Sequence, residues 1–286
     1  MSKKLLEPGL PRGFEDSFGK SLLIEKKIKE IIENNFLRYG YAEIKSSPFE
    51  YTENIGGLLT DDLNNFSKDI FTFDDKDKKI SLRFDLSAPL ARIVSEKYLE
   101  FAFPFRRFQI AEVFRNETSK TGRGRYRSFF QGDFDQIFLG KVPPQANSEI
   151  LQIICDTMLD LKFKKEQFKI NIFNRKIIDG FLNNLKIKDE NQKFKVLRAI
   201  DKFDRIDENF IDLLQKERVD PVSGDKIAGA NLSNDQATEV VEFLKLKDLK
   251  SLKLESKNEL QKEGVKELEE ILEILNENKY LDQVQV

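Results

Sequence analysis

The spacing of hydrophobic residues changes from helical to strand-like near residue 40. Over residues 20–37, isoleucines recur at intervals of three and four positions, which predicts an amphipathic helix that ends at Gly40. Residues 41–50 then favour a strand that runs into Pro48, a position suited to the edge or end of a sheet. A polar loop around a Gly-Gly pair is expected within residues 54–69.

Two hairpins are predicted in the segment that follows. The first spans residues 69–87 and has a turn of acidic and basic residues. The second consists of strands over 107–115 and 127–138, joined by an arginine-rich turn. Outside the hairpins, the pattern predicts helices over residues 88–101 and 147–161 and a short strand over 168–173.

From about residue 185 onward, lysine, aspartate and asparagine become more frequent and helical patterns dominate. Ser233 and Gln236 have the spacing of a capping box at the start of one helix. Another helix near the end has its hydrophobic residues on one face: Val265, Leu268, Ile271, Leu272 and Leu275. We therefore expect two parts, residues 1–185 and a mostly helical subdomain over 186–286, whose last residues resemble the start of a strand.

Composition excludes several classes of protein. The chain has 286 residues and a net charge of -2, so any contact with a nucleic acid must be local. It has no histidine, which excludes catalytic triads and dyads that use this residue and histidine-based metal sites. A single cysteine, Cys155, cannot form an internal disulfide and favours the reducing cytoplasm. We expect no membrane span and no signal peptide.

Polar side chains follow one face of the strand over residues 127–138. Because side chains alternate between faces, Gln131, Asp133 and Asp135 share one face, and Phe130 and Phe134 share the other, which we expect to be the core face. A solvated strand face could have the same pattern. A central strand between aromatic residues is more consistent with a cleft, since unpaired carboxylates are rarely buried completely.

The preceding strand could add a cation to this cleft. It has Ala111, Val113 and Arg115 on one face, and a guanidinium can bind a phosphate through two parallel hydrogen bonds. On the connecting turn, Arg123 and Arg125 lie beside glycines and could meet a nucleotide or an RNA backbone. A solvated, charged hairpin tip is the alternative for this turn.

Asp85 and Ser87 form a second polar cluster, two residues apart at the predicted end of a strand. On one face of that strand, they could together accept hydrogen bonds from a substrate ammonium group. Alternatively, one of them caps the helix that starts near Pro89. The residues alone favour the cap.

Several of these segments together resemble a known family. "LRFDLSAPLAR" (82–92) followed by "VFRNETSKTGRGRYRSFFQGDFD" (113–135) resembles the catalytic domain of the histidyl-tRNA synthetases. "YGYAEIKSSPFE" (39–50) resembles class II motif 1, which builds the dimer interface. Shorter similarities lie at residues 10–19, 173–182 and 197–206. The resemblance implies an α+β fold, with a class II synthetase-like antiparallel sheet flanked by helices and a helical insertion.

The resemblance also implies roles for individual residues. Arg115 matches the motif 2 arginine that holds the ATP α-phosphate and the carboxyl region of the amino acid. Asp85, Ser87 and Gln131 match positions that hold the α-ammonium group of histidine. Asp135 matches the acid that hydrogen-bonds to the imidazole ring. For Asp133 the resemblance gives no role.

The reaction implied by the resemblance has two steps. The carboxylate of histidine attacks the α-phosphorus of ATP to give histidyl-adenylate and pyrophosphate, and the histidyl group then moves to the 3′ end of tRNA(His). Arg123 and Arg125 lie in the motif 2 loop, which reaches toward ATP and the tRNA. Mg²⁺ accompanies the phosphates, and no metal site made by the protein itself is expected. The implied protein is a cytoplasmic homodimer, joined through motif 1.

Some parts of the family pattern do not occur in residues 1–286. An "RGLxYYTG"-like segment, motif 3 and an anticodon-binding domain are missing, so the sequence resembles the N-terminal portion of a synthetase and is expected to be inactive alone. One alternative is a regulatory subunit of ATP phosphoribosyltransferase, which has the same fold without charging tRNA. The joint presence of Arg115, Gln131 and Asp135 argues against it. Another alternative, a non-catalytic RNA-binding module, would not need the acids of the cleft.

Overall fold

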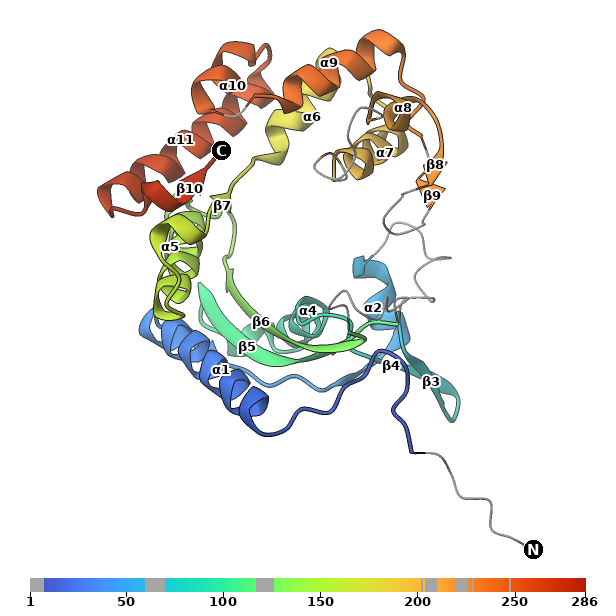
Figure 1. Ribbon diagram of the computed structural model, residues 1–286, viewed down its shortest axis with the longest axis vertical. Coiled ribbons are helices and arrows are strands. Elements are labelled where there is room, and N and C mark those ends of the chain that lie inside the picture. Colours follow the sequence, from blue (N-terminus) through green and yellow to red (C-terminus); the bar gives the residue numbers. More distant parts are fainter. Residues whose placement is uncertain are drawn as a thin grey trace, which may run out of the picture. The chain divides into compact units, whose positions relative to one another are not determined.

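The computed structural model describes residues 8–59, 70–116, 126–201, 203, 210–219, 226–227, 229–246 and 248–286. The chain folds into two compact units (Figure 1). The first contains residues 1–142 and 156–162, and the second contains residues 143–155 and 163–286. Helix α5 (Pro144–Asp160) contributes to both units. The division at residue 185 into a catalytic part and an inserted part stays a prediction.

The main sheet of the first unit is built on one long hairpin. Strands β5 (Phe105–Phe114) and β6 (Ser128–Ile137) pair antiparallel along their whole lengths, as predicted. Strand β1 (Ala42–Glu43) joins the other edge of β5 in the parallel direction. This sheet is therefore mixed, and the antiparallel pairing expected from the sequence applies to its hairpin.

Helix α1 (Lys20–Arg38) covers one face of this hairpin. The ring of Phe36 lies 5.2 Å from that of Phe108 and 4.7 Å from that of Phe134, measured between centroids. The helix ends before Gly40, whose φ of 77° is in the left-handed region that glycine favours. The predicted helix and the core position of Phe134 are confirmed. The core position expected for Phe130 is wrong, because its side chain is 47% exposed and its ring is covered by the ammonium group of Lys29.

A smaller antiparallel sheet lies beside the hairpin in the same unit. Its strands, in spatial order, are β2 (Phe49–Tyr51), β4 (Lys78–Leu82) and β3 (Thr72–Asp75). The first predicted hairpin is thus confirmed as β3 and β4. The chain continues into α4 (Ser87–Glu96) and the short helix η1 (Tyr98–Glu100).

The predicted strand over residues 41–50 is interrupted. Strand β1 ends at Glu43 and β2 begins only at Phe49, so the two segments belong to different sheets. Pro48 has no N–H group to continue a ladder. Before it, the hydroxyl of Ser46 donates a hydrogen bond to the side chain of Gln109 at 3.0 Å. This side-chain contact and a backbone hydrogen bond from Ile44 to Phe108 hold the segment between the two strands against β5.

The prediction of a polar loop within residues 54–69 is wrong for the first part of this range, which is helical. Helix α2 spans Thr52–Leu59, and residues 60–69 lie outside the described part of the chain. Ile55 is buried against Ile70 and Phe84. This packing outweighs the low helical propensity of the Gly-Gly pair.

The second unit is mostly helical. Its helices are α6 (Arg175–Asn184), α7 (Glu190–Ile200), α8 (Phe210–Gln215), α9 (Asn234–Leu244), α10 (Leu249–Glu255) and α11 (Glu259–Glu277). The short elements are η2 (Lys165–Gln167), η4 (Leu281–Gln283), the parallel pair β7 (Ile170–Asn171) and β10 (Val284–Gln285), and the antiparallel pair β8 (Arg218–Val219) and β9 (Lys226–Ile227).

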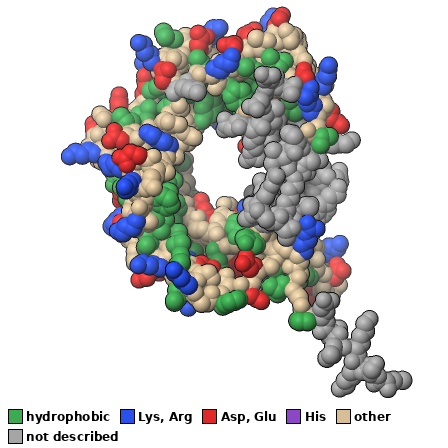
Figure 2. Space-filling view, viewed as in Figure 1, with side chains coloured by type: hydrophobic (Ala, Val, Ile, Leu, Met, Phe, Trp, Pro, Cys, Tyr) green, Lys and Arg blue, Asp and Glu red, His purple; other side chains and the backbone are tan. Residues whose placement is uncertain are grey.

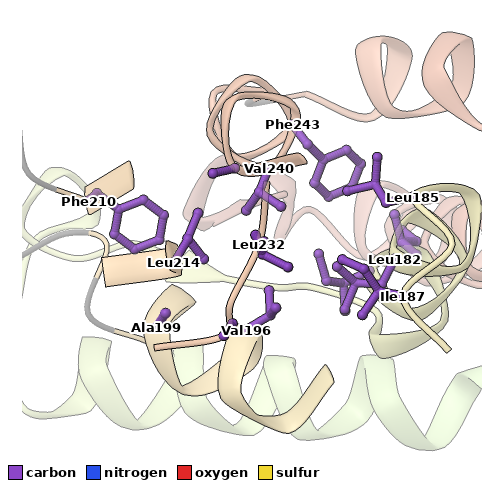
Figure 3. Packing of buried hydrophobic residues seen from close by; sticks show 14 of the residues in the cluster. Leu182, Leu185, Ile187, Val196, Ala199, Phe210, Leu214, Leu232, Val240 and Phe243 are labelled. Carbon is purple, nitrogen blue, oxygen red and sulfur yellow. The ribbon is translucent and has the colours of Figure 1, made fainter. Parts of the chain in front are cut away.

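The helices of this unit share one apolar core. Leucine, isoleucine and valine side chains such as Leu182, Val196 and Leu214 are completely buried in it (Figure 3). The predicted capping box at α9 is confirmed, because Ser233 and Gln236 each accept a hydrogen bond from the backbone of the other. Within the described residues, the helices include none that is long and apolar enough to cross a membrane.

Candidate active site

The β5–β6 hairpin has a polar face on the side opposite α1. Residues directly opposite each other in an antiparallel pair lie on the same face. The pairs on this face are Arg107 with Asp135, Gln109 with Asp133, and Ala111 with Gln131. The structure therefore confirms the predicted alignment of Gln131, Asp133 and Asp135 and adds two polar residues from the neighbouring strand.

Arg107 is the largest completely buried side chain of the first unit and lies between two acids. Its Nη2 atom is 3.1 Å from Oδ2 of Asp133 and also forms an ion pair with Oδ2 of Asp135. The sequence argument missed Arg107 because it followed the face of β5 no further back than Ala111. Continuing the two-residue period to 109 and 107 would have found both polar residues of this strand.

The carboxyl group of Asp135 has competing influences on its pKa. Burial raises the pKa above the usual aspartate value, the positive charge of Arg107 lowers it, and the negative charge of Asp133 raises it further. The net result is a raised pKa. The charge of Asp135 in the folded protein therefore depends on the presence of Arg107.

Gln131 offers an acceptor to a ligand. Its Oε1 atom is buried and has no hydrogen-bond partner among the described residues. A buried amide oxygen without a partner is unfavourable by about 1–3 kcal/mol, and such groups are uncommon in folded proteins. An ammonium or other N–H donor on this face would satisfy it.

Arg115 follows the end of β5 and lies between two aromatic rings. Its guanidinium carbon is 4.5 Å from the centroid of Phe84 and 5.0 Å from that of Phe129. Its Nε–H donates to the carbonyl oxygen of Phe84 at 3.4 Å. These contacts fix the stem of the side chain and bring the arginine beside the segment that leads to Asp85.

Asp85 and Ser87 do not lie on a strand. Strand β4 ends at Leu82, so the expectation that they share the face of a strand end is wrong. Oδ1 of Asp85 accepts a hydrogen bond from the backbone N–H of Ala88 at 3.0 Å, which confirms the capping alternative for this residue. Ser87 is the exposed first residue of α4. Capping occupies one carboxylate oxygen of Asp85, so a ligand contact for these two residues stays a prediction.

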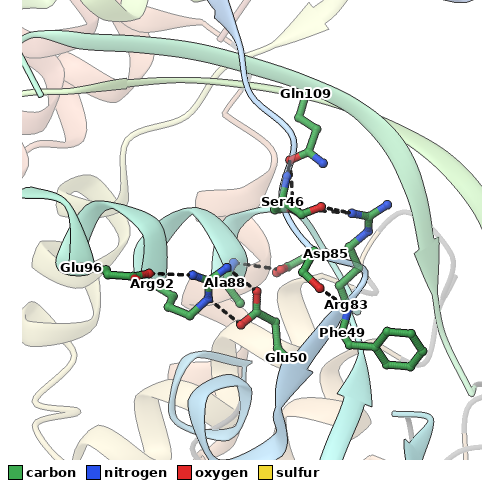
Figure 4. A network of polar contacts seen from close by, with 10 residues as sticks. Ser46, Phe49, Glu50, Arg83, Asp85, Ala88, Arg92, Glu96 and Gln109 are labelled. Carbon is green, nitrogen blue, oxygen red and sulfur yellow. Dashed lines mark hydrogen bonds and ion pairs between the residues drawn. The ribbon is translucent and has the colours of Figure 1, made fainter. Parts of the chain in front are cut away.

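A polar network holds this segment against the hairpin (Figure 4). Arg83 donates from Nη1 to the carbonyl oxygen of Ser46 at 3.1 Å, and the hydroxyl of Ser46 donates to Gln109 on β5. Arg92 of α4 forms two hydrogen bonds, of 2.6 and 2.9 Å, with the buried carboxylate of Glu50 on β2. Helix α4 and the residues before it are thus connected to both sheets.

Arg123 and Arg125, of the motif 2-like turn, lie outside the described residues. Among the residues that the structure describes, there is no group of three or more acidic or cysteine side chains that could hold a metal ion.

Comparison with known proteins identifies the relatives of this chain. The family model described as histidyl-tRNA synthetase matches residues 13–222. A histidine–tRNA ligase of Pelagibacter ubique (strain HTCC1062) is 49% identical over 283 residues, which are 98% of this chain and 60% of that protein. One of Ruegeria pomeroyi is 35% identical over 240 residues, which are 82% of this chain and 47% of the relative. The chain thus spans at most about three fifths of these relatives.

Solved structures share the fold. Histidyl-tRNA synthetase from Nostoc sp. PCC 7120 matches with a TM-score of 0.73 and 22% identity, over 97% of this chain and 59% of that one. A Bacillus halodurans C protein is described as an ATP phosphoribosyltransferase regulatory subunit/histidyl-tRNA synthetase. It matches with a TM-score of 0.76 and 18% identity, over 99% of this chain and 68% of that one. The predicted α+β, class II synthetase-like fold is confirmed.

Proposed function

The chain belongs to the histidyl-tRNA synthetase family, and on this premise we propose that it forms part of the catalytic domain of a histidine–tRNA ligase. One observation supports the proposal most strongly. The β5–β6 hairpin has Gln131, whose buried Oε1 has no partner among the described residues, and a partly exposed acid, Asp135, on the same face. Histidine has donors that suit both, an ammonium group and a ring N–H.

The proposed pose of histidine follows from these groups. The ring N–H donates to Asp135, and the ammonium group donates to Oε1 of Gln131 and to the carboxylate oxygen of Asp85 that does not cap α4. Ser87 lies in the same segment and would add a hydroxyl acceptor. An amino acid without a ring N–H would leave the carboxylate of Asp135 without its partner, which disfavours binding.

Arg115 is proposed to bind the α-phosphate of ATP and the carboxylate of histidine. Attack of this carboxylate on the α-phosphorus gives histidyl-adenylate and pyrophosphate, and the ribose at the 3′ end of tRNA(His) then accepts the histidyl group. Arg123 and Arg125 would contact ATP and the tRNA. Mg²⁺ enters with ATP as part of the substrate. The protein contributes positioning and charge stabilisation and needs no nucleophile of its own.

We also propose a cytoplasmic homodimer that forms through the motif 1-like segment. Phe49, within this segment, is 46% exposed, and α1 before it exposes Leu23, Ile24 and Ile28. Figure 2 shows hydrophobic side chains among lysines over α1. Exposed apolar side chains of this kind are typical of an interface core.

The alternative, a regulatory subunit of ATP phosphoribosyltransferase, has the same fold. Similarity at 18% identity to a protein described by both names does not separate the two. The relative at 49% identity is a ligase, and the combination of Arg115, Gln131 and Asp135 suits activation of histidine.

Histidine-dependent exchange between ATP and pyrophosphate tests the proposal on the gene product at its natural length. The wild-type protein should catalyse exchange, and Arg115→Ala should abolish it. Arg38→Ala is a matched control, because Arg38 forms a surface ion pair with Asp156. Wild-type rates in Arg115→Ala would refute the assignment of this residue, and a wild-type protein without exchange would favour the regulatory role.

A further inference from the structure

We propose that Arg107 is a positioning residue of the histidine site, which holds Asp133 and Asp135 so that Asp135 stays ionised and turns one oxygen toward the imidazole ring. The inference rests on the proposed function and deepens it, because it assigns roles to Arg107 and Asp133. The juxtaposition on which it stands belongs to the hairpin and does not depend on the identity of the ligand.

The backbone register places these three residues together. Arg107 is directly opposite Asp135, and Asp133 is two residues further along the same face of β6. Opposite residues of an antiparallel pair have Cβ atoms about 4.5–5.5 Å apart, and diagonal neighbours are within reach of a long side chain. One arginine can therefore contact both acids without any rearrangement of the sheet.

The two carboxylates have different roles, which follow from the atoms that contact Arg107. Nη2 of Arg107 donates a hydrogen bond to Oδ2 of Asp133 and forms an ion pair with Oδ2 of Asp135, an atom that has no hydrogen-bond partner among the described residues. Oδ2 of Asp135 is buried, yet 34% of its side chain remains accessible. The accessible part belongs to the remaining atoms, which leaves Oδ1 as the oxygen of Asp135 that can meet a ligand.

The charges explain why an arginine is needed. Two carboxylates and one guanidinium have a net charge of -1, which attracts an N–H donor of the ligand. Burial and the charge of Asp133 both favour the protonated form of Asp135, and Arg107 opposes them. Burial raises the pKa of the nearby Tyr41, the hydrogen bond from Gln136 and the positive charge of Arg106 lower it, and the negative charge of Asp135 raises it.

A purely structural ion pair explains the arrangement less well. Nε and Nη1 of Arg107 are buried without hydrogen-bond partners among the described residues. Burying an arginine whose N–H groups lack partners is unfavourable. Apolar residues of similar volume often stabilise a protein as well as a buried ion pair does, or better. A role in setting the charge of Asp135 accounts for a cation at this position.

The direct test measures the pKa of Asp135 in the 286-residue chain without ligand, by ¹³C NMR of its carboxyl group. Arg107→Met should raise this pKa, because the opposing positive charge is lost. Asp133→Asn should lower it, because a like charge is lost. Arg92→Met is the matched control: it removes an ion pair with the buried Glu50 in the same unit and should leave the pKa of Asp135 unchanged.

Opposite shifts in Arg107→Met and Asp133→Asn are the expected result. An unchanged pKa in Arg107→Met, or shifts of the same sign in both variants, would overturn the proposal. If Arg107→Met does not fold, Arg107→Lys retains a point charge that cannot serve both acids as the planar guanidinium does, and it should shift the pKa in the same direction by less. Asp133→Asn remains an independent test of the sign.

Histidine binding, measured by calorimetry on the gene product at its natural length, connects the pKa to function. Arg107→Met should weaken binding near pH 7 by about 10- to 100-fold, a loss of the size seen when a residue that orients a metal ligand is removed. Arg107→Lys should recover part of the loss. Equal affinity of wild type and Arg107→Met would overturn the role of Arg107 alone, whereas a wild-type protein that binds no histidine would overturn the proposed function.

Discussion

The guanidinium carbon of Arg115 lies 4.5 Å from the centre of the Phe84 ring, which joins the end of β5 to the segment that leads into α4. The carbonyl oxygen of Phe84 also accepts the Nε–H of this arginine. The two sequence segments that most resemble the synthetase family therefore meet at one side chain. With Nε occupied, the two terminal nitrogens of Arg115 are the ones suited to a phosphate and a carboxylate.

We predict that Arg115→Lys lowers kcat/KM for histidine-dependent exchange by about 100-fold or more, as when a donor to a developing negative charge is removed. Lysine keeps the charge but has neither the planar fork nor the stacking between two rings. Thermal unfolding of the variant should remain close to that of wild type. Activity equal to wild type would show that a point charge suffices at this position.

Gln131 and Gln109 are a matched pair with opposite expected effects. Gln131→Met removes a buried acceptor that has no partner in the described part of the chain, so the free energy of unfolding should stay equal or rise, while the KM for histidine increases. Gln109→Met removes the acceptor of the Ser46 hydroxyl and should destabilise the protein by about 1–3 kcal/mol. Urea unfolding and exchange kinetics measure both. Equal destabilisation by the two variants would contradict the account.

The raised pKa of Asp135 predicts that the stability of the protein depends on pH in a definite direction. Its pKa is raised in the folded protein, so the folded state binds this proton more tightly than the unfolded chain. The proton on Asp135 therefore stabilises the folded state. This contribution to the free energy of unfolding is complete below the usual aspartate pKa and is lost as the pH rises through the raised pKa of the folded protein. Relative to Asp135→Asn, wild type should therefore lose free energy of unfolding over that window. Urea titrations at several pH values measure the difference, and a gain with rising pH would mean that attraction to Arg107 dominates.

Close packing in the second unit depends on Gly180. A Cβ atom at this position in α6 would lie 2.6 Å from Cγ of Gln261 and 2.8 Å from Oδ1 of Asn258 at the start of α11. Gly180→Ala should thus destabilise the protein by about 1–3 kcal/mol, although alanine is the better helix former. Gly132→Ala is the control, since its Cβ would meet Ile32 at an ordinary 3.6 Å. Thermal unfolding measures the stability of both variants. Equal midpoint temperatures for Gly180→Ala and Gly132→Ala would contradict the prediction.

Local patterns of apolar residues predicted those helices and strands whose side-chain orientation follows directly from the helical or strand period. The isoleucine spacing predicted the helix α1, and the alternation along β6 predicted its two faces, because period and geometry are linked directly. Ile24, Ile28 and Phe130 are nevertheless exposed, so burial did not follow from the period alone. The helix α2 was not predicted, because its Gly-Gly pair has low propensity and the burial of Ile55 comes from residues distant in sequence. A local pattern contains no information on such contacts.

The same limit applies to the site. The acids of β6 could be found from one strand, whereas the ion pairs of Arg107 required the register between two strands. Pro48 was recognised as a strand boundary, but the transfer of the chain to a second sheet depends on the partners of Ser46, which the sequence does not specify. The motif 2-like arginines at 123 and 125 remain predictions.

The central claim is that the carboxylate of Asp135 selects histidine for activation on this hairpin. The most direct measurement is kcat/KM for histidine in ATP–pyrophosphate exchange, compared between wild type and Asp135→Asn in the gene product at its natural length. The account predicts a loss of about 100-fold or more in the variant, with the KM for ATP unchanged. Exchange that is independent of histidine in wild type, or equally efficient in Asp135→Asn, would contradict it.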